Sequence, residues 1–132
     1  MSTTAEQQQA VEAIVREADR LQSDVEGFVA LLTDDAAIVN FVGRRVAGRK
    51  QIRKVMGRAL ASPLAQVRTR TEIVDVRFPA PGVALVNAVK HVSDGRSDAE
   101  PLGADRGNMT FVLVERDGVW KIALAQTTPI VA

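Results

Sequence analysis

The segment between Val29 and Ile52 constrains the fold more than any other part of the chain. An apolar helical end runs into a turn at Thr33-Asp34-Asp35, and a short apolar strand follows over 36–41. After a turn at Gly43, another helix begins behind Gly48. This order of elements predicts the start of a small cone-shaped α+β fold with a one-mouthed pocket. The chain is therefore a candidate binder of a small molecule.

Length and composition predict one globular domain over residues 1–132. A net charge of +1 argues against attraction of the whole protein to nucleic acid or to an anionic membrane. No apolar run approaches the roughly 20 residues of a membrane span. The first residues lack the basic and apolar regions of a secretory signal. We therefore expect a cytoplasmic protein.

Three residue types restrict the chemistry, because the chain has no cysteine, one histidine and no tyrosine. Disulfides, thiol catalysis and cysteine-ligated metals are excluded. One subunit cannot use two histidines as metal ligands or as an acid–base pair, and no phenol can donate to a developing oxyanion. We expect neither a metal nor another cofactor.

Helices are predicted in the first half of the chain. Capping boxes at residues 3–6 and 23–26 mark the starts of the first two helices. The third helix begins behind Gly48, has one apolar face, and ends at Pro63. The second helix is expected to bury Phe28, Val29 and Leu32.

The second half reads as strands. Residues 44–47 are predicted to form a hairpin with the strand at 36–41, and four longer strands follow over 67–78, 83–92, 107–116 and 119–128. Turn residues at 79–82 lie between the first two of these longer strands, and turn residues at 117–118 lie between the last two. Helices followed by a meander predict three N-terminal helices packed on a curved, mainly antiparallel sheet.

Alternation along the strands predicts which side chains point inward. In the last strand Lys121 marks the outer face, so the alternate row from Trp120 to Gln126 should face inward. The strand at 83–92 carries apolar residues on both faces, which indicates a sheet covered twice. A second subunit is the simplest outer cover, and we therefore expect a homodimer through the outer sheet face.

Three motifs, in this order and spacing, carry a resemblance that covers nearly the whole chain: residues 31–36, 48–52 and 117–123. The chain resembles the nuclear-transport-factor-2-like (NTF2-like) superfamily, and within it the SnoaL-like and SgcJ/EcaC-like small proteins. The resemblance implies the cone fold with a hydrophobic pocket. Some SgcJ/EcaC-like proteins are associated with natural product biosynthesis of enediynes and polyketides. Other relatives are isomerases, dehydratases, cyclases, epoxide hydrolases or non-enzymes.

For each kind of enzyme that the resemblance suggests, this sequence lacks at least one of the catalytic residues. Ketosteroid-isomerase-like sites use a tyrosine, which is absent, and scytalone-dehydratase-like sites use two histidines, whereas only His91 exists. Limonene-epoxide-hydrolase-like sites use an asparagine and a tyrosine on the first strand together with an Arg-x-Asp pair. Asn40 matches that asparagine, but Ile38 occupies the tyrosine position and the strand at 83–92 has no Arg-x-Asp.

Three polar residues are the candidate site groups. His91 is a candidate general acid or base, and its alternative is a strand-end histidine with one hydrogen-bond partner. Asn40 is a candidate for orienting a substrate, or else it forms a turn. Gln126 would offer its amide to the pocket, or it lies at a polar sheet edge. The proposed apolar walls are Phe28, Ile38, Met56, Met109, Phe111 and Trp120.

Other charged residues have simpler explanations. Asp34 and Asp35 are expected to form a turn rather than a catalytic pair, and Asp75 should be exposed. The basic stretch over 36–71 reads as a solvated helix face, with an anion or nucleic-acid patch as the weaker alternative. The long segment 93–106 is either a lid or a mobile loop, and its acids do not follow a calcium-loop pattern.

The leading hypothesis is a pocket for a polyketide-like or other small hydrophobic ligand, with lyase, isomerase or cyclase-type chemistry. In it His91 moves a proton while Asn40 and Gln126 position the substrate. The alternative is a non-catalytic binding or dimeric assembly protein on the same fold. A polar group deep in the pocket would distinguish the two.

Overall fold

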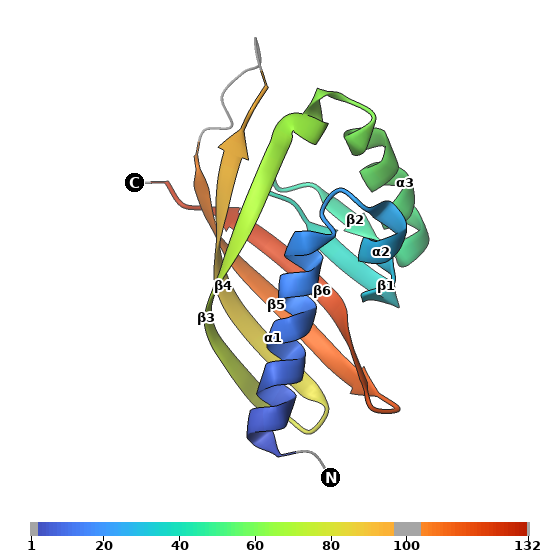
Figure 1. Cartoon of the computed structure of the whole chain (residues 1–132), viewed down its shortest axis with the longest axis vertical. Coiled ribbons are helices and arrows are strands. Elements are labelled where there is room, and N and C mark those ends of the chain that lie inside the picture. The colour runs from blue at the N-terminus through green and yellow to red at the C-terminus, as the bar shows by residue number, and fades with distance from the viewer. Residues whose placement is uncertain (1–2, 97–103, 132) are drawn as a thin grey trace.

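The computed structural model describes residues 3–96 and 104–131. The N-terminal part contains α1 (Thr4–Arg20), α2 (Val25–Val29), β1 (Leu32–Val39), β2 (Arg45–Ala47), α3 (Arg49–Leu60) and the 3-10 turn η1 (Pro63–Gln66). Four long strands follow: β3 (Val67–Ala80), β4 (Val83–Asp94), β5 (Arg106–Arg116) and β6 (Val119–Pro129). Each predicted strand is present within a few residues of its expected bounds (Figure 1). The first strand begins at Leu32, so the turn expected at residues 33–35 is wrong and these residues belong to β1.

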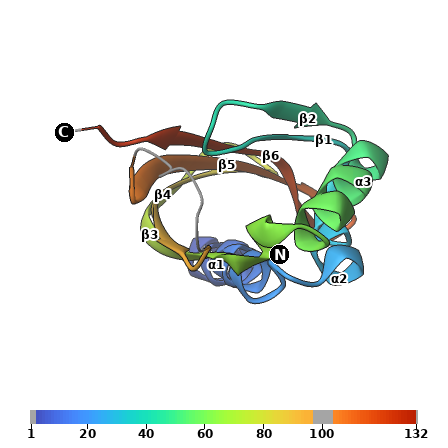
Figure 2. The ribbon, with the colours of Figure 1, turned by 90° about the horizontal axis from the view of Figure 1, so that it is seen from above.

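The strands form one six-stranded sheet in the order β2-β1-β6-β5-β4-β3. Neighbouring strands are antiparallel, except that β1 runs parallel to β6. The sheet curves, and α1, α2 and α3 lie on its concave side (Figure 2). The predicted α+β architecture, with helices on a curved and mainly antiparallel sheet, is confirmed.

The first helix begins at the predicted cap and packs by its predicted stripe. The Thr3 hydroxyl accepts a hydrogen bond from the backbone N–H of Glu6, which satisfies one free donor of the first turn. Val11, Val15 and Ala18 recur on one face and are buried. No helix in the described ranges is both long and apolar enough to cross a membrane.

The end of α1 also covers the free edge of β3. The Gln22 side-chain amide donates to the Thr69 carbonyl (2.9 Å) and accepts from the Thr69 N–H (2.8 Å). The Asp19 carboxylate accepts from the Thr71 N–H (2.7 Å) and hydroxyl (2.6 Å). These bonds satisfy backbone groups that an edge strand otherwise leaves open to pairing.

Two details of the second helix differ from the prediction. Its N-cap is Asp24 rather than Ser23, because the Asp24 carboxylate accepts from the Gly27 N–H at 3.0 Å. The helix ends at Val29, so Leu32 belongs to β1 instead of to its buried face. The third helix begins behind Gly48 as expected, and Gly48 has a φ of 90°, a value that favours glycine.

The core fills one end of the cone. It contains Leu32, Val86, Phe111, Leu113, Trp120 and Ile122, each at most 5% exposed. The Trp120 ring packs against Phe78 with ring centroids 5.9 Å apart. Close packing of large side chains at this end leaves the other end of the inner face as the place where a ligand can approach.

A bulge in β6 reverses the alternation that the sequence suggests. Ile122 pairs with Leu113 and Leu124 pairs with Val112, so Ala123 is an extra residue on β6. One extra residue moves every later side chain to the opposite face. Ala125 and Thr127 are therefore buried, and Gln126 is exposed. The expected inward orientation of Gln126 is wrong for this reason.

Candidate functional site

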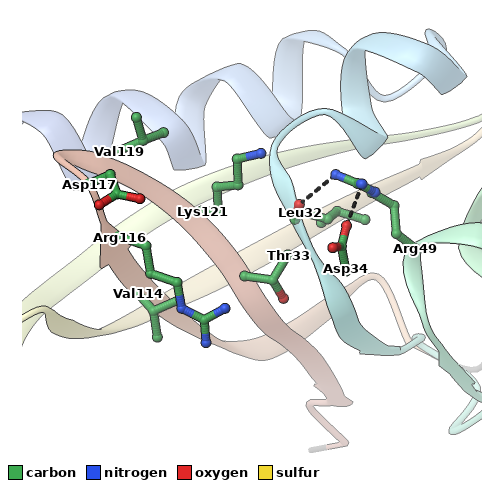
Figure 3. A pocket seen from close by; sticks show the side chains of 9 residues that line it. All are labelled: Leu32, Thr33, Asp34, Arg49, Val114, Arg116, Asp117, Val119 and Lys121. Carbon is green, nitrogen blue, oxygen red and sulfur yellow. Dashed lines mark hydrogen bonds and ion pairs between the residues drawn. The ribbon is translucent and has the colours of Figure 1, made fainter.

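A groove of about 440 Å³ lies on the outer face of the sheet, between the start of β1 and the β5–β6 turn. The pairing of β1 with β6 is interrupted at this place. Leu32 pairs with Ile122, and the next paired residue of β1 is Ala37, which pairs with Leu124. The lining residues are Leu32, Thr33, Asp34, Arg49, Val114, Arg116, Asp117, Val119 and Lys121 (Figure 3).

The groove carries mixed charge. Arg49 forms an ion pair with Asp34 and donates to the Leu32 carbonyl at 3.4 Å. Within the described part of the chain, Arg116 and Lys121 make no ion pair or side-chain hydrogen bond. None of the predicted apolar wall residues lines this groove. Arg116 is exposed and Arg49 and Lys121 are half-buried, and these cations suit weak contact with an anion more than enclosure of an apolar ligand.

The inner face of β4 shows where the cone becomes accessible. Ala84 and Val86 are 0% exposed and Ala88 is 2% exposed. The next two inward residues, Lys90 and Val92, are only half-buried. On β5 the same change occurs between Phe111, which is buried, and Met109, which is half-buried. Solvent therefore reaches the inner face on the Lys90 side, which we call the mouth side.

Lys90 is the residue that gives the mouth side its chemistry. Loss of hydration lowers the pKa of its ammonium group, and the negative charge of Asp19 offsets part of that effect. Among the described residues no side chain forms an ion pair or hydrogen bond with Lys90. Every fully buried side-chain nitrogen of the described residues has a hydrogen-bond partner. Because the Lys90 amine has no such partner, it is not fully buried and still reaches solvent.

The cross-strand neighbours of Lys90 are a threonine and a glycine. Lys90 pairs with Thr71 on β3 and with Gly107 on β5. Gly107 has no side chain, and a Cβ there would lie 2.7 Å from Thr127 Cγ2 and 3.2 Å from Phe41 Cε2. The amine thus lies near the two Asp19–Thr71 hydrogen bonds, across from a glycine that cannot accept a larger side chain without movement.

His91 lies on the opposite face from Lys90. Its Nε2 is 2.9 Å from a carboxylate oxygen of Glu72, and its side chain is 29% exposed. This hydrogen bond lowers the pKa of the Glu72 carboxyl group. The geometry matches a strand histidine with one partner. A catalytic role for His91 stays a prediction, without an inner-face position to support it.

Asn40 forms the β1–β2 turn. Its side-chain oxygen accepts from the Val42 N–H at 3.1 Å and from the Arg44 N–H at 2.9 Å. Gln126 is exposed on the outer face and pairs with Thr110 of β5, whereas His91 pairs with Arg106 at the far end of that strand. The structure therefore does not bring the three predicted polar groups together on the inner face.

The proposed wall residues fall into two groups. Phe111 and Trp120 are buried in the core and close the bottom of the cone. Phe28, Ile38 and Met109 are half-buried and pack against that core, and Met56 on α3 is half-buried as well. Of these, Met109 is the one that the strand register places near Lys90 on the inner face.

The remaining charged candidates have structural roles. Asp34 pairs with Arg49, and the Asp35 carboxylate accepts from the Thr33 hydroxyl at 2.9 Å, both within the irregular part of β1. Asp75 is exposed, as predicted. In the described ranges no group of three or more His, Asp or Glu residues is placed to hold a metal ion.

The basic and loop segments can be placed in part. The basic side chains Arg53, Lys54 and Arg58 lie on the exposed side of α3, which fits a solvated helix face. The segment expected as a lid includes residues 97–103, which lie outside the described residues. At its start, the Gly95 N–H donates to the Gln66 carbonyl at 3.0 Å.

Sequence reasoning missed Lys90, although a signal was present. Lys90 lies in the same alternate row of β4 as Ala84, Val86 and Ala88, although the sequence does not show which row faces inward. The adjacent His91 attracted the functional interpretation because histidine titrates near neutral pH. A lysine at a small-residue row inside a sheet is the more unusual feature.

Comparisons with known proteins agree with this fold. Residues 9–130 match the family described as SnoaL-like domain. No curated protein sequence matches the chain. A domain of unknown function with a cystatin-like fold from Nostoc punctiforme is similar, with 25% identity, a TM-score of 0.82, and coverage of 99% of this chain and 81% of that chain.

Two further solved structures show the same fold. An NTF-2-like protein of unknown function from Shewanella oneidensis has 10% identity and a TM-score of 0.73, with 92% of this chain and 98% of that chain covered. A ketosteroid isomerase-like protein from Erwinia carotovora atroseptica has 17% identity and a TM-score of 0.71, with 94% and 96% covered. The narrower SgcJ/EcaC-like resemblance stays a prediction. The chain belongs to the SnoaL-like domain family and has the NTF2-like fold.

Proposed function

We propose that the protein binds a small, largely apolar molecule on the mouth side of the inner sheet face, where Lys90 contacts an oxygen atom of the ligand. The half-buried amine of Lys90, without a partner among the described side chains, is the observation that carries this proposal. Ligand sites commonly combine apolar walls with a few polar groups that fix orientation. Met109 and Val92, which are half-buried on the same face, would supply neighbouring contact surface.

The chemistry of Lys90 selects the ligand class. An ammonium group in a poorly hydrated place attracts a carboxylate, enolate or carbonyl oxygen more strongly than it would in bulk water. The ligand class that fits is an apolar molecule with a carbonyl or carboxylate group. This class includes polyketide-like molecules. The role in natural product biosynthesis is part of this proposal and follows from the ligand class together with the SnoaL-like family.

Binding is the function that this geometry favours over catalysis. Among the described residues, Asp19 is the carboxylate that acts electrostatically on Lys90, and it already accepts two hydrogen bonds from Thr71. It is therefore poorly placed to accept a proton from a ligand. Lys90 alone orients a ligand and stabilises negative charge on its oxygen.

An isomerase- or cyclase-type reaction is the second candidate, because the same charge would stabilise an enolate. Incubation of 2-acetylnaphthalene with the protein in D₂O tests it, with the methyl signal followed by NMR. Exchange of the methyl protons that depends on Lys90 would support catalysis. Exchange at the rate of the buffer alone would leave binding as the function.

The binding test is a titration with 2-naphthoate, a carboxylate on an apolar ring. Loss of a charged hydrogen bond costs about 1.5–3 kcal/mol, so Lys90→Met should weaken binding by roughly tenfold to a hundredfold. His91→Gln, next to Lys90 but on the outer face, is the matched control and should change the affinity less than twofold. Equal affinity of wild type and Lys90→Met would refute the proposal.

We also propose a homodimer through the outer sheet face. Leu85, Val112 and Leu124 lie opposite one another on that face and are half-buried rather than covered. A second copy would cover this apolar row. Light scattering should give twice the monomer mass, Val112→Glu should halve it, and Val42→Glu in an exposed turn should not. A monomeric wild type would overturn this proposal.

A further inference from the structure

We propose that Lys90 forms an imine with the carbonyl carbon of an apolar aldehyde or ketone bound on the mouth side of the inner face. This inference rests on the proposed function and deepens it, because it names the ligand group and the bond that forms. A lysine that reacts in this way needs a neutral amine, access to the carbonyl, and freedom from ion pairs. The structure offers all three conditions at Lys90.

The first condition is the neutral amine. Poor hydration of the ammonium lowers the pKa of Lys90, so the free amine is populated at a lower pH than in an exposed lysine. Desolvation in apolar surroundings is a known way to activate a lysine nucleophile. Asp19 on α1 is the charged group that acts on Lys90, and its effect opposes the shift without cancelling it.

Access is the second condition. The cross-strand neighbour of Lys90 on β5 is Gly107, so that strand itself places no side chain beside the amine, and Thr127 and Phe41 pack against the glycine. On β4 the inner row changes from fully buried Val86 to half-buried Lys90, so the amine lies at the boundary between the core and solvent. A ligand ring would contact apolar inner-face residues while its carbonyl lies at that boundary.

Freedom from ion pairs is the third condition, and it distinguishes Lys90 from a structural lysine. No described carboxylate lies within ion-pair distance of its amine. A buried lysine without a partner costs stability, and such groups concentrate at functional sites. By contrast, the outward neighbour His91 has its hydrogen-bond partner Glu72 at 2.9 Å.

The proposed step balances without an oxidant or reductant. The amine lone pair attacks the carbonyl carbon, a C–N bond forms, and a proton moves from nitrogen to oxygen to give a carbinolamine. Water then leaves with the carbonyl oxygen and the second proton of the amine, and the C=N bond of the imine forms. The reverse step, addition of water, releases the carbonyl compound and restores Lys90.

Reductive trapping with 2-naphthaldehyde and sodium cyanoborohydride tests the inference. Hydride converts the imine into a stable secondary amine, and mass spectrometry of the digested protein locates it. We expect the initial rate at Lys90 to exceed that at Lys54, which is exposed on α3, by at least tenfold. The rate at Lys90 should also level off at a pH below the ordinary lysine pKa of 10.5.

Lys90→Arg is the control, since arginine keeps a positive charge but is not a comparable nucleophile near neutral pH. It should lose the fast adduct while circular dichroism shows an unchanged fold, and 2-naphthoate should compete with trapping in wild type. Trapping at Lys90 no faster than at Lys54 would overturn the imine. If 2-naphthoate still binds through Lys90, the proposed function survives; if it does not, both fail.

Discussion

Lys90 and Gly107 lie opposite each other in the β4–β5 ladder, so the half-buried lysine of the inner face has a residue without a side chain as its neighbour. A Cβ at Gly107 would lie 2.7 Å from Thr127 Cγ2, 3.0 Å from the Thr128 carbonyl oxygen and 3.2 Å from Phe41. Thr127, Thr128 and Phe41 therefore pack tightly around Gly107, the cross-strand neighbour of Lys90.

Gly107→Ala should destabilise the protein by about 1–3 kcal/mol, the usual cost of overpacking. Urea unfolding measures this change. Gly57→Ala is the matched control: a Cβ there meets nothing within 4 Å, and alanine should stabilise α3 by roughly 0.5–1 kcal/mol. Thr127→Ser removes the closest methyl group and should recover part of the Gly107→Ala loss. Additive losses in the double variant would contradict this packing.

Lys90→Met should stabilise the protein at pH 7. The folded state releases the Lys90 proton at a lower pH than the unfolded chain does, because burial lowers its pKa below 10.5. Between the lowered pKa and 10.5 the unfolded chain binds more protons, so the free energy of unfolding of wild type rises with pH there. Below that window the cost of burying the ammonium is fully present.

The expected gain from Lys90→Met is therefore about 1–3 kcal/mol at pH 7 and shrinks as the pH approaches about 11. Urea unfolding at several pH values measures it. Lys54→Met, at an exposed position on α3, should show no such pH-dependent gain. A loss of stability in Lys90→Met that is constant with pH would show that the side chain stabilises the fold by packing alone.

Asp19→Ala should loosen the contact between α1 and the edge of β3. The carboxylate accepts from the Thr71 N–H at 2.7 Å and from its hydroxyl at 2.6 Å, and loss of these bonds should cost about 1–3 kcal/mol. It should also lower the pKa of Lys90 further, because the charge of Asp19 raises it. Glu17→Ala on the same helix breaks only an exposed ion pair and should change the stability far less. Equal effects of the two changes would refute a special role for Asp19.

Asn40→Ala separates the turn-forming role from a site role. Its side-chain oxygen accepts from two backbone N–H groups of the β1–β2 turn, and we expect a loss of about 1 kcal/mol in unfolding free energy. Asn40→Asp keeps the acceptor and should restore most of it. Affinity for 2-naphthoate should change less than twofold in both. A tenfold loss of affinity in folded Asn40→Ala would place Asn40 in the ligand site instead.

The sequence was sufficient for the order of elements because periodicity and turn residues are local signals. The strands after Val67, the cap at Thr3 and the helix start at Gly48 all follow from such signals. The extra residue Ala123 in β6 was not predictable in this way, since pairing with β5 produces the bulge. It was this bulge that turned Gln126 outward.

The candidate site was predictable only in part for a related reason. Because β4 has apolar residues on both faces, alternation did not show which face is inner, and neither Lys90 nor His91 had an assigned direction. The packing of α1 against the sheet decides that question. Only then does Lys90, rather than His91, become the titratable residue of the inner face.

The location of a bound ligand tests the inner-face site most directly. Intermolecular NOEs between 2-naphthoate and protein with ¹³C-labelled methyl groups report which face the ring contacts. We predict NOEs to the methyl groups of Met109 and Val92 on the inner face and none to Leu124 on the outer face. NOEs to Leu124 in the absence of NOEs to Met109 would contradict the account.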